Sequence, residues 1–179
     1  MDYRYWISLT TANYSDSSNW SLTSGGVGGA SPPGLNDIAM FDASGTGPCI
    51  FDSTPQIFSM NLSESRTFFG DCTVVNLDLI SGDTSAGNLN SNFHVIGDLI
   101  NESGYGSKLS DHNISIFMDG STTQNIYNHS NGIISSLTIK KDTTFQVVCQ
   151  GDSPVLIKDS FIISDGTFNS NGLDVQVFG

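Results

Sequence analysis

The chain has 179 residues, a net charge of −12 and only six Lys and Arg residues. It therefore offers no cluster of cations for nucleic-acid phosphates or for anionic membrane surfaces. Charged residues make up 13% of the sequence, about half the usual share, so solubility depends on Ser, Thr, Asn and Gly, which favour turns and strand surfaces over helices. No run of about twenty apolar residues is present, and we expect no membrane insertion.

The N-terminal segment is unusually rich in aromatic residues. Trp6, Trp20 and three tyrosines lie in the first twenty residues, among Ser, Thr and Asn. The segment SGGVGGASPPG (24–34) follows, and DIAMFD (37–42) predicts the first strand. No charged region followed by an apolar stretch begins the chain. If Met1 is the true start, we expect no export by the usual secretory route.

Strand signals fill the rest of the chain, and helical signals are almost absent. Each predicted strand is short, rich in β-branched or aromatic residues, and bounded by Gly, Asn, Asp or Ser. The predicted strands are VVNLDLI (74–80), FHVIGDLI (93–100), ISIFM (114–118), SSLTIK (135–140), FQVVC (145–149), VLIKDSFII (155–163) and LDVQVF (173–178).

A pair of apolar positions recurs about every twenty residues. Val75, Val95, Ile116, Leu137, Ile157 and Val177 are separated by 20, 21, 21, 20 and 20 residues, and Thr73, Phe93, Ile114, Ser135, Val155 and Val175 precede them by two. Residues two apart point to the same face of a strand. A looser second set comprises Leu79/Ile80, Leu99/Ile100, Ile126 and Phe145/Val147. A fixed period of about twenty residues is typical of solenoids.

The sequence therefore predicts an all-β, right-handed parallel β-helix with coils of about twenty residues, each strand pairing with its equivalent one coil away. Predicted corners, where Gly and Asn tolerate positive φ, are Gly82–Asp83, Gly104, Asp119–Gly120, Asn131–Gly132, Gly151–Asp152, Asp165–Gly166 and Asn171–Gly172. We expect residues 1–50 to form an N-terminal cap and first strand, and residues 51–179 the coils. An antiparallel sandwich is the alternative fold.

The N-terminal aromatic residues have two interpretations. The first coil of a solenoid exposes an unpaired strand edge and an open apolar core, so it needs a cap. Trp6, Tyr14, Trp20, Phe41 and Phe51 suit that role. The alternative is a docking face or a carbohydrate-stacking platform, for which Tyr3, Tyr5, Trp6, Tyr14 and Trp20 are the candidates.

The N-terminal segment RYWISLTTANYSDSSNWSLTSGGVGGASPPGLNDIAMFD (4–42) resembles the start of a family of parallel β-helix proteins, found as bacteriophage tail-fibre or other virion appendage proteins and as bacterial adhesins. Ala12-Asn13-Tyr14 departs from the Gly-Asn-Trp of that pattern. GSTTQNIYN (120–128), SSLTIKKDTTFQV (135–147) and SFIISDGTFNSNGLDVQVFG (160–179) also resemble coils of the family, so the likeness covers most of the chain.

The resemblance implies a surface or structural role without chemistry that can be carried over. We expect a non-enzymatic bacteriophage virion protein, a tail fibre, head fibre or decoration protein, with a host-attachment role as an option. Its partners would be other virion proteins, two further copies in a homotrimer, and a host surface glycan. The alternatives are a secreted adhesin at the cell surface that binds glycans, and a polysaccharide-degrading enzyme. Val175–Gly179 resembles an internal coil, so we expect either a partner or further chain to cover that end.

Side chains suited to catalysis or metal binding are scattered. No spacing places two of His94, His112 and His129 on one face as metal ligands, and His94 is expected to point outward. Asp78, Asp98 and Asp119, at intervals of 20 and 21, predict a row of carboxylates on adjacent coils, which a glycoside hydrolase would need as a pair. Solvated acids are the simpler interpretation, and we expect no catalytic, cofactor or metal site.

Three cysteines are present, Cys49, Cys72 and Cys149, without a CxxC motif. An odd number does not suit a disulfide framework. We expect buried free thiols that behave as small apolar residues, with a Cys49–Cys72 bridge only in an oxidising medium.

Overall fold

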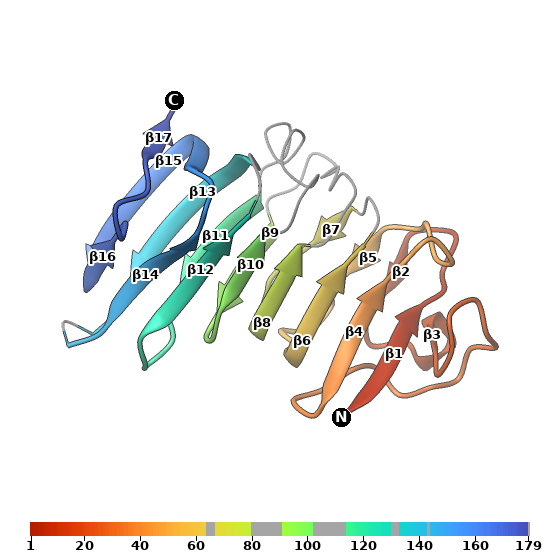
Figure 1. The fold of residues 1–179 in the computed structure, drawn as a ribbon. Helices are drawn as coiled ribbons and strands as arrows, with labels where there is room; N and C mark the ends of the chain where they lie inside the picture. The colour runs from red at the N-terminus through yellow and green to blue at the C-terminus, as the bar shows by residue number, and fades with distance from the viewer. Residues whose placement is uncertain (64–66, 80–90, 102–113, 130–132, 143, 179) are drawn as a thin grey trace.

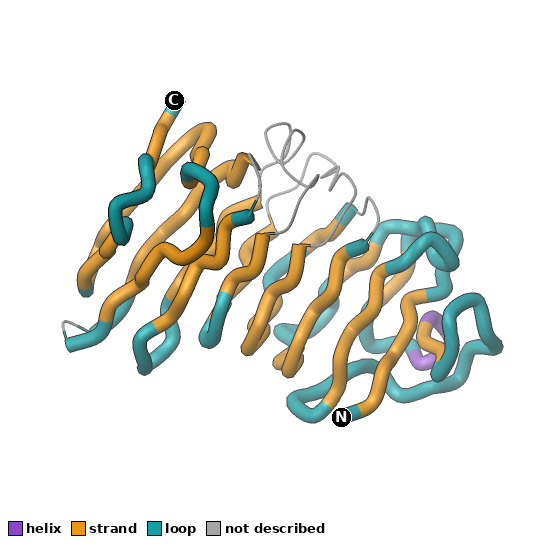
Figure 2. The backbone as a smooth tube through the Cα atoms, in the orientation of Figure 1, coloured by secondary structure: helices purple, strands orange, loops and turns teal. Residues whose placement is uncertain are grey.

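Strands make up almost all of the regular structure, and they stack into a parallel β-solenoid (Figure 1). The computed structural model describes residues 1–63, 67–79, 91–101, 114–129, 133–142 and 144–178. Chain order advances steadily along the stack, and the two termini lie at opposite ends (Figure 1). The tube in Figure 2 shows strands running side by side with loops at their ends. The predicted all-β solenoid is confirmed, and the antiparallel sandwich is not formed.

Two sheets contain the described strands. The smaller one has three short strands, β2 (Ala12–Asn13), β5 (Cys49–Ile50) and β7 (Phe68–Phe69). The larger has fourteen: β1 (Asp2–Trp6), β3 (Trp20–Ser21), β4 (Asp37–Phe41), β6 (Gln56–Leu62), β8 (Cys72–Leu79), β9 (Ser91–Val95), β10 (Leu99–Asn101), β11 (Ile114–Met118), β12 (Gln124–Asn128), β13 (Ile133–Lys140), β14 (Gln146–Gly151), β15 (Val155–Asp165), β16 (Thr167–Asn169) and β17 (Val175–Val177). Every pairing between described strands is parallel except that of β1 with β3.

The larger sheet divides at β8. Strands β1, β4, β6 and β8 pair in sequence. The first part of β8, Cys72–Val74, then pairs with β9, and its last part, Leu77–Leu79, pairs with β10. Two ladders continue from there, one through β9, β11, β13, β15 and β17 and the other through β10, β12, β14 and β16. A single bent strand in the early coils is thus replaced by two strands with a turn between them.

The sheet passes through residue 50 without interruption, because β4 and β6 pair over four residues from Ile38–Ser59 to Phe41–Leu62. The predicted boundary between residues 1–50 and 51–179 therefore separates two parts of one continuous stack. No helix of the described residues is long and apolar enough to cross a membrane.

The core is a ladder of buried apolar side chains, and its register differs in part from the prediction. Ile116 pairs with Leu137, and Ile157 with Val177, as predicted. Val75 is wrong, because Val74 is the buried residue that pairs with Val95.

Two further predicted partners are also wrong. Ile116 pairs with Phe93 rather than Val95, and Ile157 pairs with Ile134 rather than Leu137. The cause is unequal coil length: the step is 21 residues from Val74 to Val95 but 23 from Phe93 to Ile116. A bulge in the β13–β15 pairing shifts the register again.

The second ladder is closer to expectation. Leu77, Leu99, Ile126 and Cys149 pair in register, and all four side chains are buried. Val147, a predicted member, is also fully buried. Ile80 lies outside the described residues.

Glycines mark the corners that the structure describes. Gly151, Gly166 and Gly172 have positive φ, as does Asn171 with φ 52°. At Gly151, with φ 112°, a Cβ atom would also lie 2.1 Å from the backbone oxygen of Asn128 in the neighbouring coil. The predicted corners at Gly82–Asp83, Gly104 and Asn131–Gly132 lie outside the described residues.

Candidate functional site

The N-terminal end of the solenoid is closed by a short antiparallel strand. Strand β3 runs back along β1, with Tyr5 opposite Ser21 and Trp6 opposite Trp20. The outer side of β3 is covered in turn, because the backbone NH groups of Gly29 and Ala30 donate to the oxygen of Trp20, each at 3.1 Å. The strand edge that a first coil would expose is therefore partly paired.

A cluster of aromatic rings fills the core beneath this cap. Trp6 and Trp20 are fully buried, and Tyr14, Phe41 and Phe51 are at most 6% exposed. The Trp20 ring lies 5.1 Å from that of Tyr14 and 5.6 Å from that of Phe41, both edge-on. These edge-to-face contacts are the favoured geometry for aromatic pairs. The burial of all five residues agrees with the capping interpretation.

The polar atoms of these rings are hydrogen-bonded to the backbone. The Trp6 Nε1–H donates to Gly47 O at 2.9 Å, and the Trp20 Nε1–H donates to Tyr14 O at 2.7 Å. The Tyr14 hydroxyl donates to Pro33 O at 2.6 Å. Burial, with the nearby Cys49, Cys72 and Asp37, raises the pKa of Tyr14 far above its usual range. These bonds hold loops far apart in sequence against the end of the core.

The five residues predicted for docking separate into two groups. Trp6, Tyr14 and Trp20 are buried in the cap, so their side chains present no surface to a partner. Tyr3 is 52% exposed, and Tyr5 is half-buried beside it with the ring centroids 6.3 Å apart. Only Tyr3 and Tyr5 can serve as surface contacts.

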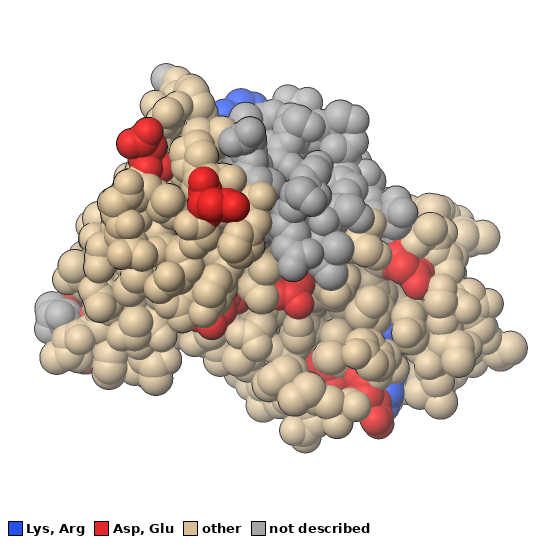
Figure 3. Space-filling view, in the orientation of Figure 1, with Lys and Arg blue, Asp and Glu red and all other residues tan. Residues whose placement is uncertain are grey.

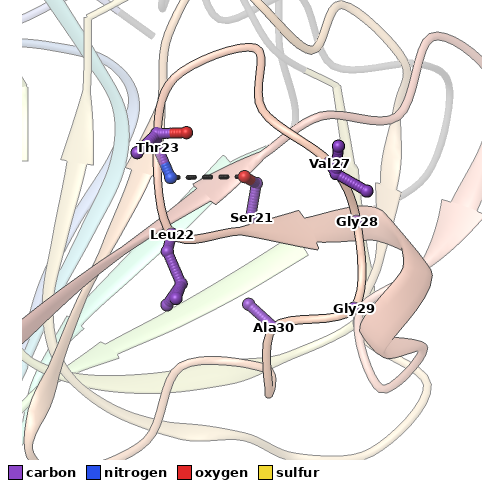
Figure 4. A pocket seen from close by; sticks show the side chains of 7 residues that line it. All are labelled: Ser21, Leu22, Thr23, Val27, Gly28, Gly29 and Ala30. Carbon is purple, nitrogen blue, oxygen red and sulfur yellow. Dashed lines mark hydrogen bonds between the residues drawn. The ribbon is translucent and has the colours of Figure 1, made fainter.

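The glycine-rich segment forms a shallow pocket on the cap (Figure 4). Its volume is about 310 Å³, and it is lined by Ser21, Leu22, Thr23, Val27, Gly28, Gly29 and Ala30. Leu22 and Val27 stand exposed at its sides. In Figure 4 the side chains do not converge on a common point, and the pocket contains no charged group.

The outer surface of β1, β4, β6, β8, β10, β12 and β14 forms a second candidate, which we call the lateral face. Successive side chains of a strand alternate between core and surface, and parallel register aligns the outward ones in columns. The first column contains Tyr5, Met40, Asn61, Asp78, Ile100, Tyr127 and Gln150. The second contains Tyr3, Ile38, Ser59, Asn76, Asp98, Asn125 and Val148.

Hydrogen bonds connect the polar members of the second column. Asn76 Oδ1 accepts from the backbone NH of Asp98 at 3.0 Å. Asp98 Oδ1 accepts from the backbone NH of Asn125 at 2.7 Å and from its Nδ2 at 3.1 Å. Three successive coils are thus tied together along the face, and these side chains are held in fixed positions.

The predicted row of carboxylates does not form. Asp78 lies opposite Ile100, while Asp98 lies between Asn76 and Asn125 in the other column. The coil from Leu77 to Leu99 is 22 residues long and that from Leu99 to Ile126 is 27, so intervals of 20 and 21 do not align these residues. The pair that would have suited glycoside hydrolysis is therefore absent from adjacent positions.

The third member of that row, Asp119, binds a histidine instead. His94 Nδ1 lies 2.7 Å from Asp119 Oδ2, and the His94 ring stacks on Phe117 with centroids 5.0 Å apart. The His94 side chain is 33% exposed, which agrees with its predicted outward position. His129 Nδ1 lies 3.5 Å from Asp152 Oδ1 at the surface, and His112 lies outside the described residues.

A polar network is buried at the corner between the two ladders. Lys141 is 2% exposed and Gln124 is fully buried. Lys141 Nζ donates to Gly120 O at 2.6 Å and to Gln124 Oε1. Gln124 Nε2 donates to Val95 O at 2.7 Å and to Gly97 O at 2.5 Å. The network joins three coils, and neither its periodic position nor its residue types distinguished it in the sequence.

The three thiols are free and fully enclosed or nearly so. Cys49, Cys72 and Cys149 are each 0% exposed, which confirms the expectation of buried free cysteines. Burial raises the pKa of Cys72 well above its usual range and that of Cys149 to about 11. In the part of the chain that the structure describes, no three His, Cys, Asp or Glu side chains gather as a metal site would require.

The fold and surfaces define a parallel β-solenoid closed at its N-terminal end. At the other end, Ile162, Ile163, Val177 and Phe178 are each about half exposed. No protein-family model, no curated protein and no solved structure matches the chain.

Proposed function

We propose that this chain is a non-enzymatic structural protein of a bacteriophage particle, a tail fibre, head fibre or decoration protein, that also contributes to host attachment. The observation that supports the proposal most is the uninterrupted parallel pairing from β1 to β17. Each coil is hydrogen-bonded to the next along its strands, which gives an elongated and stiff element. The sequence resemblance to virion appendage proteins directs the proposal to phage rather than to other users of this fold.

A structural role also suits the polar contacts of the interior and surface. Lys141, Gln124, Asp98 and Asn125 all use their side chains to join neighbouring coils. The carboxylates that suggested an enzyme, Asp78 and Asp98, lie in different columns. The described geometry thus supports stiffness of the stack more than chemistry on its surface.

The test is mass spectrometry of density-purified phage particles and of the cell-free medium from the same culture. The proposal requires the chain at a fixed copy number in the particles, and that number would distinguish tail, vertex and capsid surface. Recovery only in the medium would contradict the proposal and favour the secreted adhesin. Multi-angle light scattering of the purified chain tests the homotrimer that belongs to the same proposal, for which the measured mass must be three times 19.1 kDa.

A further inference from the structure

We infer that the lateral face binds an uncharged glycan chain along the axis of the solenoid. The inference deepens the attachment role in the proposed function, since it names the chemical class of the ligand and the residues that would contact it. It depends on the order of side chains in the two columns, which only the strand register reveals.

Tyrosines lie at both ends of the face, with polar groups between them. Tyr3 and Tyr5 belong to β1, and Tyr127 belongs to β12. Between them lie the amides and carboxylates of Asn61, Asn76, Asp78, Asp98 and Asn125. Tyr5 and Tyr127 are five coils apart in one column, about 24 Å at the usual spacing of about 4.8 Å between paired strands.

This order suits a sugar polymer better than a protein. Protein interfaces have an apolar centre and a polar rim. The lateral face has the reverse order, with a polar centre and aromatic residues toward its ends. An extended glycan presents hydroxyl groups along its whole length, which amides and carboxylates can bind, and apolar ring faces, which can stack on tyrosine.

The charge of the face selects against anionic polymers. The two columns contain Asp78 and Asp98 and no Lys or Arg among their described members. Arg4, which lies between Tyr3 and Tyr5 on β1, is only 12% exposed and lies 3.6 Å from Asp37. Figure 3 likewise shows scattered acidic groups and little basic surface on the described part of the molecule. Acidic polysaccharides and nucleic acids would be repelled.

The hydrogen bonds among Asn76, Asp98 and Asn125 add preorganisation. These side chains are fixed by their bonds to neighbouring coils before any ligand arrives. Binding therefore loses less side-chain entropy than it would on a flexible surface.

The experiment is affinity electrophoresis of the purified chain in gels that contain a neutral α-glucan, a mannan or a galactan, with a polyuronate as the charged comparison. We expect retardation by at least one neutral polymer and none by the polyuronate. Tyr5→Ala and Tyr127→Ala should each weaken binding about two- to tenfold, the value of one aromatic contact. Phe117→Ala is the matched control, because Phe117 is an outward aromatic residue beside His94 in the other ladder.

Every outcome decides the inference once circular dichroism shows that the variants are folded. Retardation that both tyrosine variants reduce, and Phe117→Ala does not, supports the lateral face. Equal loss in Phe117→Ala, no loss in either tyrosine variant, retardation by the polyuronate alone, or no retardation at all would overturn it. Because the assay uses the purified chain, its failure leaves the particle mass spectrometry unaffected, and the two proposals fail separately.

Discussion

Lys141 donates from its Nζ to the backbone oxygen of Gly120 at 2.6 Å, across two successive coils and inside the protein. Replacing Lys141 with Met would leave that oxygen without this donor and would remove one of the two groups bound to Gln124 Oε1. We expect Lys141→Met to lower the free energy of unfolding by about 1–3 kcal/mol, the cost of an unsatisfied buried polar group. Urea unfolding measures this loss, and unchanged stability would show that the network contributes nothing net.

The same lysine predicts a pH dependence. Burial lowers the pKa of Lys141, although the nearby Asp119 acts in the opposite direction. Between the lowered folded pKa and the unfolded value of 10.5, the unfolded chain binds more protons, so this group makes stability rise with pH. Unfolding free energies of the natural chain and of Lys141→Met should therefore diverge in favour of the natural chain as pH rises through that window. A difference that shrinks over the same range would contradict the lowered pKa.

Trp20 tests the cap. Trp20→Ala should cost about 3–5 kcal/mol of unfolding free energy, because it removes a fully buried ring and the donor to Tyr14 O. Leu22→Ala, at a residue 64% exposed in the adjoining loop, is the matched control and should stay within about 0.5 kcal/mol. Thermal unfolding followed by circular dichroism compares the two. Unchanged stability of Trp20→Ala together with lost assembly would instead favour docking through this residue.

Gly120 tests how closely the coils approach at the corner. A Cβ atom at Gly120 would lie 2.1 Å from the backbone oxygen of Ile96, which cannot move without breaking the neighbouring coil. Gly120→Ala should therefore destabilise the protein by about 1–3 kcal/mol through overpacking. Gly34→Ala serves as control, since the nearest atom to its Cβ would be Asp37 Oδ2 at 3.8 Å. Equal midpoints of urea unfolding for the two variants would show that the corner can widen.

The cysteines predict slow thiol chemistry. At pH 8 the Cys149 thiol, with its pKa raised to about 11, is almost entirely protonated, and all three side chains are closed to solvent. Because the thiolate is the reactive form, iodoacetamide should label no cysteine of the folded protein at an appreciable rate and all three after denaturation. Intact-mass spectrometry counts the labels. Only one label on the denatured protein without reductant would reveal a bridge such as Cys49–Cys72.

The candidate surfaces could be foreseen only in part. The aromatic N-terminus indicated a cap, and Trp6, Tyr14 and Trp20 are indeed buried. The same residues were also candidates for docking, because an aromatic ring suits a core and a surface equally well and sequence does not give its exposure. Tyr127 and Asn125 were not singled out, since attention to inward positions leaves the outward column unexamined. Their period was present in the sequence, but unequal coils obscured it.

The sequence alone determined the class of fold. Short β-branched strands between Gly and Asn turns, repeated about every twenty residues, are compatible with stacked parallel coils and with little else. The positive φ of Gly151, Gly166 and Gly172 lies where such turns were expected. These features are local, since each depends on the conformational preferences of a few neighbouring residues.

Only the tertiary structure decided the register. Coils of 21, 22, 23 and 27 residues, a bulge in β15 and the bend of β8 determine which residue lies beside which. Because strand side chains alternate, an error of one residue exchanges core and surface, as between Val74 and Val75. For the same reason Asp78 lies beside Ile100 and not beside Asp98. The turns absorb extra residues at little cost to the stack, so their lengths follow no rule that the sequence displays.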